Sequence, residues 1–154
     1  LSPMPPSTTE LELIALREDG CPARPLALKA AMQANCAQTA AYLQQVGYQP
    51  PWIGYLAVAD GIAVGGGAFV GPARGGEVEI AYYTLPEHEG RGHASATAAG
   101  LIGLARAHDP KVQLIAHTLR ERNTSVRILQ RLGFVLNGEA EDPDAGRVWR
   151  WRLG

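Results

Sequence analysis

The chain has 154 residues, of which 46% are hydrophobic and 19% charged, so its composition is that of a folded domain and excludes a disordered protein. A formal net charge of -1 gives no electrostatic reason to expect nucleic acid or an anionic membrane as a partner. The length suits one domain whose core needs neither metals nor disulfides. We interpret the proline-rich residues 1–9 as a flexible leader and residues 10–154 as a single domain.

The two cysteines, Cys21 and Cys36, have no metal-type spacing. Because a domain of this size does not require a disulfide, we expect free thiols and assign the protein to the reducing cytoplasm. No stretch of about 18 apolar residues is present, and the N-terminal segment lacks the basic and apolar parts of a signal peptide. We therefore expect no membrane partner and no metal.

The first expected elements are a strand and a helical region. Leu11–Leu16 predicts the first strand, and a loop follows as far as Arg24. Residues 26–46 are rich in alanine, leucine and glutamine, which favour helix, and Pro25 suits the first turn of a helix. We expect one broken helix or two short helices here, ending near Gly47.

Three strands joined by short turns are expected next, as an antiparallel meander. Residues 53–59 suit a buried strand, and Asp60-Gly61 is a strong hairpin signal. Residues 62–70 form the return strand, whose three consecutive glycines suggest a bulge or a close backbone approach. Residues 77–85 form the third strand, after a second turn.

A helix, a strand, a short helix and a hairpin complete the order. Residues 95–108 carry apolar side chains three and four apart, which is typical of a helix that packs one face on a sheet. Residues 112–117 predict a strand that lies parallel to the preceding one, because a crossover helix joins the two. A short helix is expected over Ser125–Leu132, and a final hairpin is expected from residues 134–136 and 147–153.

The most informative segment is the glycine-rich turn Glu89-Gly90-Arg91-Gly92-His93-Ala94, which stands between a strand and a helix. A turn that opens a helix offers backbone N–H groups with no intrahelical partner, and the helix dipole adds positive potential. Glycine also lets a phosphate approach the backbone closely. The sequence therefore predicts a site for a phosphate-bearing ligand.

Two common phosphate motifs do not fit this turn. The Gly-Lys-Ser/Thr end of a P-loop is absent, which argues against nucleoside triphosphate hydrolysis. Ser95 stands where a dinucleotide-binding fingerprint has its third glycine, and no acidic residue follows about 20 positions later. The glycine pair alone leaves open a plain strand–loop–helix turn that binds nothing.

Residues 84–94 resemble motif A of the GNAT superfamily of N-acetyltransferases, in which a [Gln/Arg]-x-x-Gly-x-[Gly/Ala] turn binds the pyrophosphate of acetyl-CoA. Gly92 and Ala94 match the two small positions, whereas Glu89 brings an acidic group to the Gln/Arg position. Residues 123–134 resemble motif B, which ends in Leu-Gly-Phe. The Glu-Ile-Ala-Tyr strand and the Ser-x-x-x-Leu helix look most similar to the branch that includes the ribosomal-protein N-terminal acetyltransferases.

The resemblance implies an α+β fold: a twisted, mostly antiparallel sheet of about six to seven strands, about four flanking helices, and one parallel strand pair around the acetyl-CoA cleft. It implies an enzyme, an acetyl-CoA-dependent N-acetyltransferase in which a primary amine attacks the thioester directly. That amine belongs to a small molecule or a peptide N-terminus. The alternatives are a non-catalytic acyl-CoA-binding module and an unrelated α/β binding protein. The residues assigned to acetyl-CoA are Tyr83, Thr84, Leu85, Glu89, Gly90, Arg91, Gly92, His93, Ala94 and Asn123.

Direct attack requires a base for the amine proton and donors for the thioester oxygen and the departing thiolate. Glu79 is the candidate base, through water, and the alternative is an exposed strand carboxylate. Ser125 is the candidate donor to the thiolate, and the alternative is a helix N-cap. His117 could reach the same place, although a lone histidine at a strand end is more often structural. A backbone N–H near Tyr83 is the candidate oxyanion donor.

Aromatic residues are the main candidates for further contacts. The four that cluster near the second strand are candidates to line an acceptor pocket, with core packing as the alternative for at least two of them: Tyr42, Tyr48, Trp52 and Tyr55. The final hairpin carries Trp149 and Trp151 and is a candidate surface for a homodimer.

Overall fold

The computed structural model describes residues 11–153, which form one seven-stranded sheet and three α-helices. The strand order is β1-β2-β3-β4-β5-β7-β6, and only β4 and β5 pair in parallel, which confirms the expected α+β class. The expected leader at residues 1–9 lies outside the described residues. The strands are β1 (Leu11–Ala15), β2 (Gly54–Ala59), β3 (Ile62–Phe69), β4 (Glu77–Thr84), β5 (Gln113–Thr118), β6 (Val135–Asp142) and β7 (Gly146–Leu153). The helices are α1 (Ala30–Val46), α2 (His93–His108) and α3 (Thr124–Arg131), with a short 3-10 turn, η1 (Pro86–His88).

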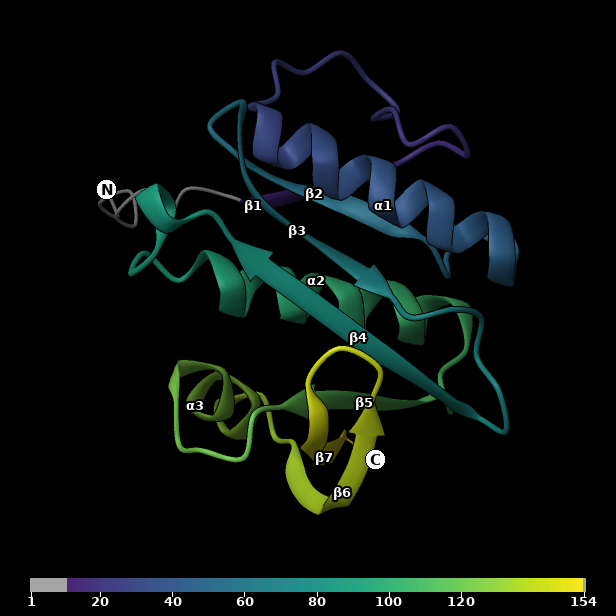
Figure 1. Cartoon of the computed structure of the whole chain (residues 1–154), viewed down its shortest axis with the longest axis vertical. Helices are drawn as coiled ribbons and strands as arrows, with labels where there is room; N and C mark the ends of the chain where they lie inside the picture. The colour runs from purple at the N-terminus through teal and green to yellow at the C-terminus, as the bar shows by residue number, and fades with distance from the viewer. Residues whose placement is uncertain (1–10, 154) are drawn as a thin grey trace, which may run out of the picture.

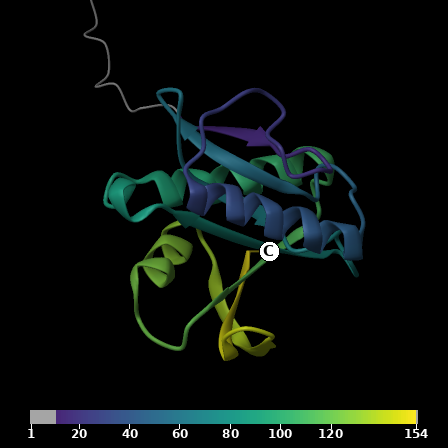
Figure 2. The same ribbon diagram turned by 45° about the horizontal axis from the view of Figure 1, so that its top comes forward.

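Helices α1 and α2 cover opposite faces of the sheet (Figures 1 and 2). Helix α2 packs against β1, β3 and β4, and the main core lies beneath it. Val78 and Ile80 of β4 belong to that core together with Leu101 of α2. Because side chains alternate along a strand, the odd-numbered residues of β4 face the side of α1.

The helical region is a single unbroken helix that begins at Ala30, so the expectation of a broken helix or two helices beginning near Pro25 is wrong. The residues before it are extended, and Leu26 and Leu28 are half-buried while their neighbours are exposed. These two leucines pack against the core beneath α1. Burial of every second residue, the pattern of an extended segment, therefore overrides the local helix propensity. Gly47 ends the helix as expected, with φ of 102°.

The turns of the meander match the expectations from sequence. Asp60 and Gly61 have φ of 51° and 75°, the pair of positive values that a tight two-residue hairpin requires. The pairing of β2 with β3 shifts by one residue midway, which is the expected bulge. Gly66 lies against the ring of Tyr83, where an added Cβ would be 2.8 Å from Cε1, so the close approach is also confirmed.

Strands β4 and β5 remain paired over a short stretch. Their register runs from Glu77–Gln113 to Ile80–Ala116, and the two strands then diverge (Figure 1). We call the region beyond Ile80 and Ala116 the β4–β5 fork. Strand β4 leads through η1 into α2, and β5 leads into α3, so the chain places the starts of both helices beyond the fork.

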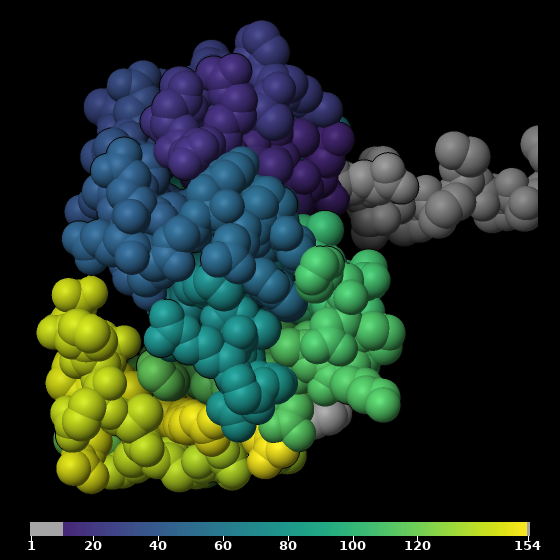
Figure 3. Space-filling model, turned by 90° about the vertical axis from the view of Figure 1, so that its right-hand side faces the viewer, coloured from purple at the N-terminus to yellow at the C-terminus, as the bar shows by residue number. Residues whose placement is uncertain are grey.

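The C-terminal hairpin, yellow in Figure 3, lies at the opposite end of the molecule from β1 and the loop that follows it, which are purple. Trp151 is buried and donates from Nε1 to Thr118 Oγ1 at 2.8 Å. It therefore belongs to the core of this chain, whereas Trp149 is half-buried. Both cysteines are free, as expected. Within residues 11–153, none of the helices is long and apolar enough to cross a membrane.

Candidate functional site

The glycine-rich turn leads directly into α2. Gly90 and Gly92 have φ of 78° and 80°, a left-handed conformation that glycine adopts without strain. Within the described residues, the backbone N–H groups of residues 90–95 find no acceptor, and the first that does is Ala96, to Gly92 O at 3.1 Å. A row of free donors at the positive end of a 16-residue helix fits an anion such as a pyrophosphate.

The side chains of this turn contribute less than its backbone. Glu89 and Arg91 are exposed, and in the part of the chain that the structure describes neither takes part in an ion pair. His93 is buried at the start of α2. The acidic group of Glu89 therefore stands beside the row of donors with no cation of the protein paired to it.

Backbone direction in β4 decides which groups face the fork. The N–H of Leu85 donates to Val64 O at 2.8 Å, and Glu79 O accepts from Val70 N at 2.8 Å. The backbone groups of odd-numbered residues therefore point toward β3. Tyr83 and Leu85, which the sequence assigned to the ligand through their backbones, direct those groups away from the fork.

The even-numbered residues of β4 direct their backbone groups toward β5, as Gly76 O shows by accepting from Gln113 N at 2.8 Å. Because the pairing with β5 ends at Ile80, the N–H and C=O groups of Tyr82 and Thr84 lie along the fork without a strand partner. Thr84 Oγ1 is also buried with no hydrogen-bond partner among the described residues. The free backbone groups along the fork are therefore those of Tyr82 and of Thr84, the second of which the sequence also assigned to the ligand.

Three titratable side chains from three strands meet on the α1 side of the sheet, and we call Glu79, His117 and Asp142 the carboxylate–histidine cluster. His117 Nδ1 lies 3.3 Å from Glu79 Oε2 and 3.8 Å from Asp142 Oδ2. Glu79 is the register partner of Ile115, two residues before His117, so both side chains share a face. The sequence predicted no metal, yet the three ligand atoms lie within 4.8 Å of one another, a spacing compatible with an ion.

The two carboxylates of the cluster differ in basicity. Burial raises the pKa of Glu79 above its ordinary value of 4.5, while a charge on His117 lowers it and the charge on Asp142 raises it. The pKa of Asp142 is lowered, because the N–H groups of Asp144 and Ala145 donate to its Oδ1 at 2.9 and 3.0 Å. Glu79 is therefore the stronger base of the two.

Asp142 was missed in the sequence. Its local signal is the Asp-Pro-Asp-Ala-Gly turn, in which the first aspartate accepts from the backbone that follows it. That signal explains a turn and says nothing of His117, which only the sheet order brings close.

A charged pocket of about 360 Å³ adjoins the cluster. Glu79, His117 and Arg150 line it from the sheet, and Tyr42 and Val46 line it from α1. Arg150 is itself paired with Glu77 at 2.6 Å. This pocket gives Glu79 access to a ligand from the α1 side.

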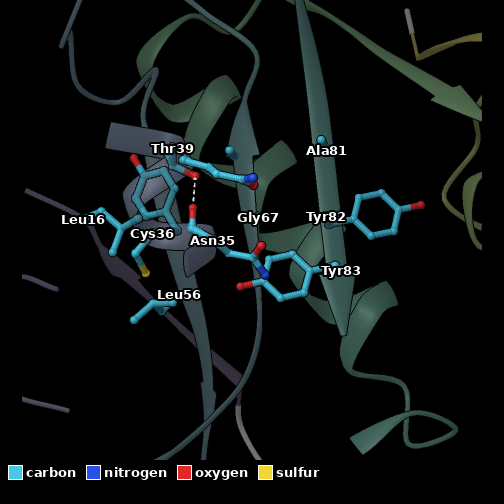
Figure 4. A pocket seen from close by; sticks show the side chains of 12 residues that line it. Leu16, Asn35, Cys36, Thr39, Leu56, Gly67, Ala81, Tyr82 and Tyr83 are labelled. Atoms are coloured by element: carbon cyan, nitrogen blue, oxygen red, sulfur yellow. Dashed lines mark hydrogen bonds between the residues drawn. The ribbon is translucent and has the colours of Figure 1, made fainter. Parts of the chain in front are cut away.

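A neutral pocket of about 240 Å³ lies farther along the same face (Figure 4). Asn35, Cys36 and Thr39 of α1 line one side and Tyr83 lines another, and Figure 4 shows Asn35 and Tyr83 close together. No charged residue lines this pocket. Ala81 lines this pocket and lies two residues beyond Glu79 on the same face of β4, so the two pockets are neighbours along that strand.

The four aromatic candidates divide between pockets and core. Tyr42 lines the charged pocket and Tyr55 lines the neutral pocket. Trp52 is buried, with its ring 5.1 Å from that of Phe69, and Tyr48 donates its hydroxyl to the backbone. Tyr55 is buried as well, and its hydroxyl donates to Pro51 O at 2.8 Å. Three of the four therefore have structural roles, in line with the alternative of core packing for at least two.

The start of α3 reverses one interpretation from the sequence. Asn123 is the N-cap, and its Oδ1 accepts from Val126 N at 3.0 Å. Ser125 is the second residue of the helix and is exposed, so its interpretation as the cap is wrong. The helix begins at Thr124, one residue earlier than expected, which moves the capping position back. Asn123, which the sequence assigned to acetyl-CoA, keeps its side-chain NH₂ group as a donor for a ligand.

Comparison with known proteins identifies the class to which this fold and site belong. Residues 13–135 match the family model of the acetyltransferase (GNAT) domain, so the chain belongs to that family of acetyltransferases. No curated protein matches the sequence.

Solved structures share the fold at low identity. The chain superposes on yncA from Salmonella typhimurium, assigned as an acetyltransferase and solved with its cofactor acetyl-CoA, with a TM-score of 0.63, 18% identity, and 94% and 93% of the two chains covered. It superposes on the ribosomal L7/L12 alpha-N-protein acetyltransferase with a TM-score of 0.67, 15% identity, and 96% and 92% covered. For the ribosomal-protein-S5-alanine acetyltransferase from Vibrio fischeri the values are 0.63, 15%, and 84% and 76%.

Proposed function

We propose that the protein is an acetyl-CoA-dependent N-acetyltransferase whose acceptor is a primary amine, on a small molecule or a peptide N-terminus. One arrangement carries this proposal. The free N–H groups of residues 90–95 lie beyond the β4–β5 fork, and strand β4, which leads to them, carries Glu79, a carboxylate whose pKa is raised. A primary amine is protonated at neutral pH, so a carboxylate of raised basicity suits the removal of its proton.

The residues of the turn and the fork fit the two ends of the co-substrate. The N–H groups of residues 90–95 would hold the pyrophosphate, with no side chain of Gly90 or Gly92 in the way. The free backbone groups of Tyr82 and Thr84 would bond to pantetheine as an added strand does. When bound, acetyl-CoA supplies an activated thioester carbonyl.

The remaining roles fall to groups of the chain around the fork. Glu79 accepts the proton of the ammonium, and the N–H of Tyr82 or Thr84 donates to the thioester oxygen as negative charge develops there. Ser125 is free of the capping role and donates to the departing thiolate from the first turn of α3. No covalent intermediate is needed, so neither cysteine is assigned a role.

Peptide N-termini remain among the proposed acceptors because two of the structures that share the fold are ribosomal-protein acetyltransferases. That likeness supports the ribosomal-protein branch as the place of this chain within the family. The free thiols of Cys21 and Cys36 support a reducing, cytoplasmic location.

The proposal is tested by calorimetric titration with acetyl-CoA and by thiol release in the presence of a panel of small amines and peptides. We expect saturable binding, and thiol release that depends on one class of amine. Absence of binding at high micromolar acetyl-CoA would overturn the proposal. Binding without thiol release for any amine would instead establish a non-catalytic acyl-CoA module.

The assigned pyrophosphate site is tested with Gly92→Asn. Asparagine tolerates a left-handed φ better than most residues, so the variant keeps the turn while placing a side chain among the donors. We expect acetyl-CoA affinity to fall about tenfold or more, the equivalent of roughly one lost charge-assisted hydrogen bond. The matched control is Gly75→Asn, also at positive φ with open space around it, which should leave affinity unchanged. Equal affinity of the two variants would refute the site.

A further inference from the structure

Two protons must leave the acceptor nitrogen when an ammonium becomes an amide. The new C–N bond forms as the C–S bond breaks; one proton ends on the thiol of CoA, and the other must reach solvent. On the basis of the proposed function, we propose that His117 takes this second proton from Glu79 and that the charge of Asp142 favours the transfer. The carboxylate–histidine cluster is then the proton exit of the site, and His117 and Asp142 act through Glu79.

The geometry of His117 supports the transfer. Its Nδ1 is buried, forms no well-aligned hydrogen bond within the described residues, and stands 3.3 Å from Glu79 Oε2. Hydrogen bonds used in proton transfer are often long or poorly aligned before the substrate binds. A small rotation of either side chain converts this contact into a hydrogen bond.

Asp142 is fixed for the supporting role. Its Oδ1 accepts the two N–H groups of the turn, which leaves Oδ2 directed at His117 from 3.8 Å. At 3.8 Å, Oδ2 forms no hydrogen bond to Nδ1, the nitrogen that also faces Glu79, so Asp142 acts through its charge, which stabilises the imidazolium that forms when a proton arrives. The lowered pKa of Asp142 keeps it ionised for that purpose.

Two of the other charged groups around the cluster, Arg150 and Glu77, are paired with each other. Arg150 donates to Glu77 Oε2 at 2.6 Å and to Asn137 Oδ1. The carboxylate of Glu77 therefore balances the positive charge of Arg150. The titratable groups that line the same pocket or the same face of the neighbouring strand are Tyr42, Arg74, Glu77, Arg150 and Arg152. None of them forms an ion pair with Glu79 in the part of the chain that is described, whereas His117 does.

The exit is needed because of where the acceptor lies. The side chain of Glu79 is 26% exposed, through the pocket that an amine would occupy. An acceptor seated there covers the carboxylate, and the proton then requires another route. His117 lines the same pocket and its side chain is 18% exposed, whereas Asp142 is 26% exposed and does not line the pocket, so the cluster has an exposed member outside the space that the acceptor covers.

Chemical rescue tests the transfer. We expect His117→Ala to lower kcat/KM about 100-fold, the usual scale for one acid–base group, without loss of acetyl-CoA binding. Imidazole at tens of millimolar should fill the space that the missing ring leaves in the variant and restore at least about a tenth of the wild-type rate, while leaving the wild type unchanged. A loss that imidazole does not restore would overturn the proposal. A wild-type enzyme that acetylates no amine would instead overturn the proposed function.

The pH profile of kcat/KM gives an independent test. A charge on His117 lowers the pKa of Glu79 and the charge on Asp142 raises it. His117→Asn should therefore move the acid limb of the profile to higher pH, and Asp142→Asn, which retains an acceptor for the turn, should move it to lower pH. The control Glu141→Gln, an exposed neighbour paired with Arg147, should not move it. Shifts in the same direction, or none, would contradict the assignment.

A metal in the cluster predicts a different result. The assay is repeated after dialysis against EDTA and again with added Zn²⁺. If the cluster is a proton exit, activity is unchanged after EDTA treatment. Added Zn²⁺ then inhibits the enzyme, because the metal would bind Nδ1 of His117 and the two carboxylates. Activity that is lost with EDTA and restored by Zn²⁺ would make the cluster a metal site and overturn the proposal.

Discussion

Glu79 is the residue at which stability and chemistry oppose each other most clearly. Its burial raises the pKa, which means that the ionised carboxylate is less favourable in the folded protein than in water. The proposed reaction requires that same ionised form as the base. Sites of this kind often cost stability, and removal of the charge then stabilises the fold while activity is lost.

We predict that Glu79→Gln lowers kcat/KM by about 10²- to 10⁴-fold and raises the melting temperature near neutral pH. Below pH 4.5, the ordinary pKa of a glutamate, Glu79 of the wild type is protonated and is uncharged like the glutamine of the variant. The wild type and the variant then have similar melting temperatures. As the pH rises through the raised pKa, the folded wild type loses a proton that it had held more tightly than the unfolded chain, and its relative stability falls. Thermal melts at about pH 4, 6 and 8 measure the difference, which should grow with pH. A difference that is independent of pH would contradict this reasoning.

Glu89 presents the opposite problem, because an acidic group stands beside donors assigned to a pyrophosphate. We predict that Glu89→Gln tightens acetyl-CoA binding about three- to fivefold at low salt, since one exposed charge is worth up to about 1 kcal/mol. The gain should shrink as ionic strength rises. Calorimetry at two salt concentrations measures it, with the exposed Glu18→Gln as control. Weaker binding would show that Glu89 contacts the ligand favourably.

At the scale of elements, the short helix α3 depends on its first residues. It has eight residues, too few to be stable without a cap and tertiary packing, and its Val126 and Leu129 are buried in the main core. The side chain of Asn123 satisfies the N–H of Val126, while Ser125 faces outward. Capping and the proposed chemistry are thus divided between two neighbouring residues.

We predict that Asn123→Ala lowers the free energy of unfolding by about 1 kcal/mol, the usual cost of losing a cap. Ser125→Ala should leave it within about 0.5 kcal/mol of wild type, as surface substitutions do, while lowering kcat. Urea denaturation and steady-state kinetics on the two variants separate the roles. If Ser125→Ala destabilises the protein as much as Asn123→Ala, the capping assignment is wrong.

At the scale of the whole molecule, the packing of α2 on the sheet joins the glycine-rich turn to the fork. Gly67 of β3 makes this packing possible, because a Cβ there would lie 2.9 Å from Leu101 Cδ1 and 3.0 Å from Thr97 Cγ2. Leu101 is fully buried. The glycine run that the sequence marked as a close approach is therefore also a helix-docking surface.

We predict that Gly67→Ala lowers the free energy of unfolding by about 1–3 kcal/mol through overpacking. Leu101→Ala alone should cost about 2–5 kcal/mol by leaving a cavity. The double variant should be less destabilised than the sum, because the added methyl group occupies part of the space that leucine vacates. Denaturant titration of all four proteins measures the coupling, and simple additivity would contradict this packing.

The sequence by itself determined the features that depend on neighbours along the chain. Strand periodicity predicted the seven strands of the described residues, although β6 extends to Asp142, well beyond the predicted residues 134–136. Asp60-Gly61 and Gly47 marked a turn and a helix end that the structure confirms. The glycine-rich turn was legible because free N–H groups at a helix start follow from local backbone geometry. The extended segment with Leu26 and Leu28 was misread, since its conformation depends on a core formed by distant residues.

The tertiary structure alone decided which groups meet. His117 was visible as a lone histidine and Asp142 as a turn residue, but the sheet order places both beside Glu79. The register of β4 likewise directs the backbone of Tyr82 and Thr84, and not that of Tyr83, toward the fork. Composition and periodicity report the face of an element, whereas strand pairing fixes its neighbours through contacts between residues far apart in the chain.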